Sequence, residues 1–179
     1  MFYFTGAANA EGTYMVHMIS DLLIHPKVVE TQAHLHHSIS KHEHLLRSAR
    51  ISYKLARVMH ADVRICVRAA MIHDIDSRAG TLRTHGRIAA EWAASLGEDR
   101  DVCQAIETHM YPLGPAPRTK EGWVVSLADK AASITDLTIC VTGMLTGRTW
   151  HRRRTLRETD PYYPMRRHRL RRSRRVRTA

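Results

Sequence analysis

The feature that most constrains this fold is the pair His73-Asp74, which directly follows a strongly apolar segment. Residues 63–71 place apolar side chains at the three- and four-residue spacing of a helix, and Asp62 is a suitable N-cap. The pair would then lie at the buried C-terminal end of that helix, where an ionised carboxylate is costly unless it is paired or metal-bound. The fold must therefore supply partners for this pair from other segments.

The remainder of the body has the same helical periodicity. Apolar residues recur at three and four positions, and two-residue alternation is rare, which predicts an all-α helical bundle. Besides the helix that ends at His73, we expect helices over 20–33, with Pro26 kinking or restarting it, and over 40–59, 86–96 and 121–144. A further helix should begin at Asp99 or Asp101 and end at His109. We expect loops at 34–39, 77–83 and 111–119.

Local signals refine three of these elements. Ser40 and Glu43 have the spacing of a capping box, which places His44 in the first turn of its helix. Thr84 is a candidate cap for the helix that follows it, so that His85 stands at its start. On the last helix, the predicted apolar side consists of Trp123, Leu127, Ala131 and Ile134.

Charge divides the chain into two parts. Of the 28 Lys and Arg residues, 13 lie in residues 148–179 against only Glu158 and Asp160, so the 15 remaining basic and 15 remaining acidic residues balance in residues 1–147. We therefore expect one helical metal-binding domain over 1–147, ordered up to Gly147, and an Arg-rich tail over 148–179 that is disordered or loosely helical. Such a tail attracts nucleic acid without sequence preference.

Cysteine content and hydropathy indicate the compartment. Cys66, Cys103 and Cys140 are scattered and lie in apolar helical patterns, which favours reduced core thiols over a disulfide framework. No segment has the form of a secretory signal or of a membrane helix. We expect a cytoplasmic protein without a membrane partner, and its oligomeric state is open.

Six residues of two chemical types could meet at one centre. They are spread over four or five predicted helices, which can direct their side chains inward, and they are His44, His73, Asp74, His85, His109 and Asp129. An imidazole beside a carboxylate on one helix end can give one ligand to each of two cations, or bridge both through the carboxylate. The set predicts a two-metal site.

The order of these residues resembles the HD-domain superfamily of metal-dependent phosphohydrolases. His44, the pair His73-Asp74, and Asp129 within Ala128-Asp129-Lys130 match its pattern, and the intervening His85 and His109 resemble the extra histidines of its two-metal branch. The resemblance extends from about residue 20 to residue 143 and implies an HD-like bundle with metals between helices.

The resemblance also implies a division of ligands. One ion would be held by His44, His73, Asp74 and Asp129, and the other by a bridging Asp74 with His85 and His109. Two divalent transition-metal ions are implied, with Fe or Mn favoured, and the donor set also suits Zn, Co or Ni. A hydroxide shared by the ions would attack a phosphate ester or anhydride of a small molecule such as a nucleotide, which makes Asp74 and His73 the catalytic pair.

One departure concerns the substrate phosphate. Many family members follow His-Asp with a glycine and then a lysine that helps to hold phosphate, whereas here Ser77 stands at the lysine position. The candidate replacements as substrate ligands are Arg78, Arg83 and Lys130. His36 and His37 precede His44 by eight and seven residues, and they could lie over the site, either supporting its ligands or donating a proton.

Two other functions are compatible with the sequence. The same six-ligand arrangement resembles the di-iron oxygenases of this superfamily, including myo-inositol oxygenase. Alternatively, the body is a scaffold, and the Arg-rich tail makes the chain a nucleic-acid-binding protein. Phosphate release, oxygen consumption and salt-dependent nucleic-acid binding distinguish the three.

Overall fold

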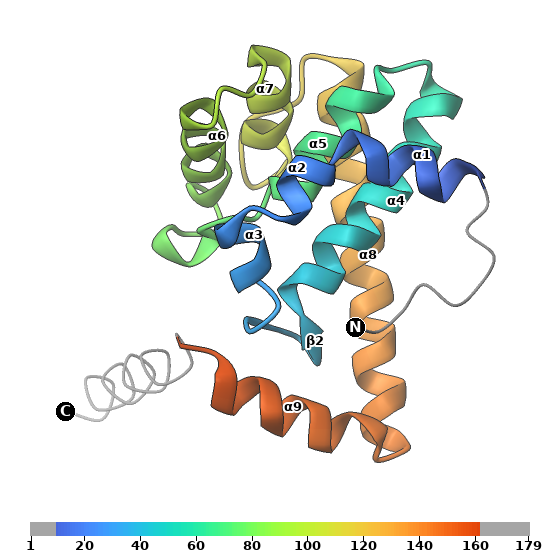
Figure 1. Cartoon of the computed structure of the whole chain (residues 1–179), viewed down its shortest axis with the longest axis vertical. Helices are drawn as coiled ribbons and strands as arrows, with labels where there is room; N and C mark the ends of the chain where they lie inside the picture. Colours follow the sequence, from blue (N-terminus) through green and yellow to red (C-terminus); the bar gives the residue numbers. More distant parts are fainter. Residues whose placement is uncertain (1–9, 162–179) are drawn as a thin grey trace.

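The computed structural model describes residues 10–161, and the regular secondary structure there is almost entirely helical (Figure 1). The helices α4 (Lys41–Met59), α5 (Val63–Ile72) and α8 (Lys120–Leu145) pack against one another, and the pair α6 (His85–Ser95) and α7 (Arg100–Thr108) flanks them. The short helices α1 (Ala10–Met18), α2 (Ser20–Leu23) and α3 (Pro26–Glu30) precede this group, and α1 contacts both α4 and α5. The all-α expectation is confirmed.

Two predicted helix starts have the expected chemistry. The Ser40 hydroxyl accepts from the Glu43 amide, and the Glu43 carboxylate accepts from the Ser40 amide, which confirms the capping box of α4. Asp62 caps α5 by accepting from the Ile65 amide at 3.0 Å. These caps fix where α4 and α5 begin, and hence where His44 and His73 lie.

Two local expectations are wrong. The segment 34–39 is not a plain loop, because β1 (Leu35–His36) pairs antiparallel with β2 (Ile39–Ser40). The Thr84 hydroxyl does not cap α6 and instead accepts from the Thr81 amide within the preceding loop, which contains the 3₁₀ turn η1 (Ser77–Ala79). In the segment 20–33, Pro26 starts α3 with His25 as its cap, which is one of the two roles expected for this proline.

The buried face of α8 also differs from the expected one. Trp123, Leu127 and Ile134 are 38%, 44% and 68% exposed, whereas the small residues Ala128 and Ala132 are fully buried. The prediction chose the face of α8 with the largest apolar side chains, and this face is not the buried one. The small side chains form the buried face because they allow α8 to approach α4 and α5 closely. The same face carries Asp129, so this rotation of the helix turns it toward the centre of the bundle.

The chain does not lose its order at Gly147. Helix α9 (Arg148–Thr159) follows at once, turns back from the end of α8 and contacts both strands of the hairpin (Figure 1). Asp160 is buried at its end and accepts from the Leu35 amide, which ties this segment to β1. The remainder of the predicted tail, residues 162–179, lies outside the described residues.

Among the helices of residues 10–161, none is both long enough and apolar enough to cross a membrane.

Gly86 sets the distance between α6 and α7. A Cβ placed there would lie 2.9 Å from the Glu107 carbonyl oxygen and 3.3 Å from His109 Nδ1. We therefore expect Gly86→Ala to lower the free energy of unfolding by about 1 to 3 kcal/mol, as overpacking does. Urea unfolding measures this, with Gly114→Ala as control because its nearest neighbour would be a Met110 Cβ at 3.4 Å. Equal stability of the two variants would contradict this packing.

Candidate metal centre

The six predicted ligands come from five segments of the bundle and lie together. His44 is in the first turn of α4, His73 is the C-cap of α5 with Asp74 next to it, His85 begins α6, His109 is the C-cap of α7, and Asp129 is on α8. All four histidines are 5% exposed or less.

The donor atoms form two adjoining clusters. In the first, Asp129 Oδ1 lies 3.2 Å from His44 Nε2 and 3.3 Å from His73 Nε2. In the second, His85 Nε2 lies 3.1 Å from His109 Nε2 and 3.6 Å from Asp74 Oδ1. The clusters are adjacent, since the ring centroids of His73 and His109 are 4.8 Å apart.

Backbone carbonyls orient three of the imidazoles. The Nδ1 atoms of His73, His85 and His109 lie 2.8, 2.9 and 2.6 Å from the carbonyl oxygens of Ala70, Thr81 and Ile106. A carbonyl only accepts, so each Nδ1 donates to its carbonyl oxygen and each ring directs Nε2 toward the centre. Histidines that bind a metal through Nε2 are commonly oriented by such a contact at Nδ1.

The donor set fits divalent transition-metal ions. The Nε2 atoms of His85 and His109 lie 3.1 Å apart while both Nδ1 atoms contact backbone carbonyls, so a single cation could be bound by both Nε2 atoms. Two ligand atoms can each lie about 2.1 Å from one cation, with a ligand–cation–ligand angle between a right angle and the tetrahedral value. These two atoms are then about 3.0 to 3.4 Å apart. Most of the observed spacings fall in this range. Imidazole and carboxylate donors without thiolates suit Fe, Mn, Zn, Co or Ni.

Electrostatic interactions within the clusters shift the pKa values of several of these groups. Burial would raise the pKa of Asp129, but its contacts with the His44 and His73 imidazoles hold that pKa well below its usual value. Burial likewise opposes ionisation of Asp74, and Lys41 with three imidazoles nevertheless lowers the pKa of its carboxyl. Burial, assisted by His73, lowers the pKa of His109 to about 3. Both carboxylates are thus ionised and His109 is neutral at neutral pH.

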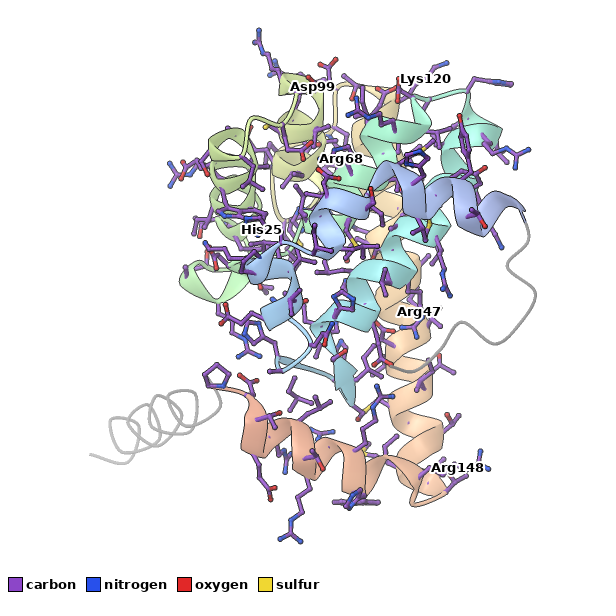
Figure 2. The ribbon with its side chains drawn as sticks, viewed as in Figure 1. His25, Arg47, Arg68, Asp99, Lys120 and Arg148 are labelled. Atoms are coloured by element: carbon purple, nitrogen blue, oxygen red, sulfur yellow. The ribbon has the colours of Figure 1, made fainter. Side chains whose placement is uncertain are left out.

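Asp136 is a site residue that the sequence reasoning missed. Its side chain is fully buried, its Oδ2 accepts from His44 Nδ1 at 2.7 Å, and Arg47, which is labelled in Figure 2, pairs with its other oxygen. This carboxylate orients His44 as the carbonyls orient the other three imidazoles. Asp136 follows Asp129 by seven residues, two helical turns along one face, and this spacing could have revealed it.

Lys41 was also missed. Its ammonium group contacts the loop after α5, at 3.0 Å from the Asp74 carbonyl oxygen and 2.5 Å from Ser77 Oγ, and it lies 3.1 Å from Asp74 Oδ2. In the family that this sequence resembles, the position of Ser77 is often occupied by a lysine. The available signal was the position of Lys41, three residues before His44 on the same face of α4.

The predicted substrate ligands make other contacts. Arg78 forms a two-pronged ion pair with Asp160 and donates to the Leu35 carbonyl. Lys130 donates to the His109 carbonyl and to both oxygens of Ser126. Arg83 is exposed in the loop before α6. The substrate roles of these three residues stay predictions.

His36 and His37, which were predicted to lie over the site, differ in their surroundings. The His36 ring lies over His44, with centroids 4.3 Å apart, and burial followed by the influence of His44 lowers the pKa of His36 to about 3. Its Nε2 is buried without a hydrogen-bond partner among the described residues. His37 is exposed in the turn of the hairpin and contacts the His36 ring.

Comparisons with known proteins give a consistent result. The family model described as HD domain matches residues 42–134. The chain is similar to Ribonuclease Y of Acidothermus cellulolyticus, at 31% identity over 59% of this chain and 22% of that protein. It is similar to Ribonuclease Y of Cutibacterium acnes and of Treponema pallidum, each at 34% identity, over 49% and 48% of this chain and 16% and 17% of those proteins.

Each match covers only part of this chain and only part of the relative. The chain spans about a fifth of the length of these curated relatives. It also resembles a glycine–tRNA ligase beta subunit from Syntrophus aciditrophicus, at 46% identity over 27% of this chain and 8% of that protein. No solved structure matches the chain significantly.

Proposed function

This chain belongs to the HD-domain superfamily of metal-dependent phosphohydrolases, and from that premise we propose that it hydrolyses a phosphate ester or anhydride of a small molecule such as a nucleotide. The observation that carries the proposal is the pair of adjoining clusters, in which the inward-facing imidazole nitrogens lie 3.1 to 3.6 Å from one another or from carboxylate oxygens. A phosphate-binding two-metal site needs such a donor set.

Each residue has a defined task in this proposal. His44, His73 and Asp129 hold one divalent ion, His85 and His109 hold the other, and Asp74 contributes to both. When bound, the ions supply Lewis acidity and lower the pKa of water near the phosphorus atom. The backbone carbonyls and Asp136 keep each Nε2 directed inward, which limits the rearrangement that binding requires.

The substrate is tested with a panel. The purified chain, reconstituted separately with Mn, Fe, Co, Ni and Zn, is incubated with nucleoside mono-, di- and triphosphates, cyclic nucleotides and phosphate monoesters. We expect metal-dependent release of phosphate or nucleotide that chelation abolishes. Oxygen consumption by a mixed-valent iron centre without any phosphate release would contradict hydrolysis and support the oxygenase.

RNA is a second candidate substrate. Two observations favour it: several of the relatives that the chain matches are named Ribonuclease Y, and α9 exposes Arg148 (labelled in Figure 2), Arg154 and Arg157 as well as Trp150. Cationic and aromatic side chains on one helix attract a nucleic-acid strand.

An end-labelled RNA oligonucleotide distinguishes the two substrates. If RNA is the substrate, replacing Arg148, Arg154 and Arg157 together by glutamine weakens RNA cleavage and its salt dependence, while cleavage of small nucleotides is unchanged. A small-molecule hydrolase leaves the oligonucleotide intact. RNA binding that survives His73→Ala without any cleavage indicates the nucleic-acid-binding alternative.

A further inference from the structure

A buried cation lies beside the proposed metal ligands. Lys41 is 4% exposed, and its ammonium group lies 3.1 Å from Asp74 Oδ2. Its other acceptors are the Asp74 carbonyl oxygen at 3.0 Å and Ser77 Oγ at 2.5 Å. The three donors of the ammonium thus have three acceptors, and only the Asp74 carboxylate among them is charged.

A purely structural role explains this arrangement poorly. Burying an ammonium group costs free energy, and a neutral donor could tie α4 to the loop after α5 by the same two neutral contacts. The charge of Lys41 is balanced by a carboxylate that also faces His85, and that we assign to divalent cations. Two divalent cations would carry more positive charge than the two carboxylates of these clusters can neutralise. Lys41 adds to this excess of positive charge. Such a centre favours an anion with more than one charge.

Position distinguishes Lys41 from the other basic side chains. Arg78 is engaged by Asp160, and Lys130 donates to neutral oxygens of His109 and Ser126. The Lys41 ammonium contacts a carboxylate of the ligand clusters directly. A phosphate bound to cations at Asp74 must lie next to Asp74, and therefore within reach of Lys41.

We propose that Lys41 binds the phosphate group of the substrate, by exchanging its contact with Asp74 Oδ2 for a phosphate oxygen. The contacts with the Asp74 carbonyl and Ser77 hold the side chain in place during this exchange. The inference rests on the proposed function to the extent that the substrate carries a phosphate. It makes Lys41 a substrate ligand, supplied by the first turn of α4.

The test measures binding of inorganic phosphate to the metal-loaded full chain by calorimetry, with metal content and thermal unfolding determined on the same samples. Lys41→Met removes the charge and Lys41→Arg retains it, while Lys54→Met on an exposed turn of α4 is the matched control. We expect Lys41→Met to keep its metal and to bind phosphate about 10- to 100-fold more weakly, the range for a lost charged hydrogen bond. Lys41→Arg should recover much of the affinity, and Lys54→Met should equal the original chain.

Several results would overturn the proposal. They are unchanged phosphate affinity in Lys41→Met, absence of phosphate binding by the original metal-loaded chain, and loss of phosphate binding only in proportion to lost metal, which would make Lys41 a positioning residue for Asp74. Phosphate binding that depends on Lys41, in a chain that hydrolyses none of the panel, would refute the proposed function and support this inference. Where turnover is found, Lys41→Met should raise KM more than it lowers kcat.

Discussion

Asp74→Ala is expected to empty both metal positions and to lower kcat/KM by more than about 1000-fold, because the metal ions supply several kcal/mol of transition-state stabilisation. Asp74 is the carboxylate that we assign to both ions, and its Oδ1 lies 3.6 Å from His85 Nε2 in the second cluster. Metal content per chain and steady-state kinetics on the same preparation measure the effect.

The comparison variant for this experiment is His109→Ala. His109 belongs to the second cluster, so its loss should weaken chiefly one ion and leave the ion held by His44, His73 and Asp129. Both variants keeping their full metal content would refute the division of ligands. Loss of both ions from each variant would show that the second ion is needed to retain the first.

Asp136→Ala is expected to have the second largest effect, and it acts on stability as well as on metal. The substitution leaves His44 Nδ1 without its acceptor and Arg47 without its partner, and breaking a buried ion pair from one side costs about 3 kcal/mol. His44 is then free to turn, and metal affinity at the first cluster should fall by about 10- to 100-fold, as for other supports of metal-binding histidines.

A chelator separates the effect of Asp136→Ala on stability from its effect on metal affinity. Urea unfolding with chelator present measures the loss of the ion pair alone, and metal titration measures the loss of orientation. Asp136→Asn keeps an acceptor for His44 Nδ1, so it should retain more metal affinity than Asp136→Ala while it also loses stability. If Asp136→Ala equals the original chain in both measurements, Asp136 does not support the site.

The sequence predicted those parts of the fold that depend on local chemistry. The caps at Ser40 and Asp62 and the helices they begin follow from hydrogen bonds between residues three apart, which a sequence displays directly. The six candidate ligands were predicted because their residue types are rare together and follow a recognisable order. The structure brings them into two clusters, and their role as ligands stays a proposal.

What the sequence failed to predict depends on contacts between distant segments. The buried face of α8 was wrong because the small residues Ala128 and Ala132 pack closest, which hydrophobicity alone does not rank. Order after Gly147 comes from tertiary contacts, such as the Asp160 carboxylate accepting from the Leu35 amide 125 residues away. Lys41 was missed for the same reason, because its partners lie on another segment.

The measurement that tests the central claim most directly is the metal content of the reconstituted full chain beside that of His73→Ala. We predict about two divalent transition-metal ions per chain in the original protein, bound through histidine nitrogen and carboxylate oxygen as seen by X-ray absorption, and a marked loss in the variant. A chain that binds none of Mn, Fe, Co, Ni or Zn, or a variant that binds them equally well, would contradict a metal centre at these residues.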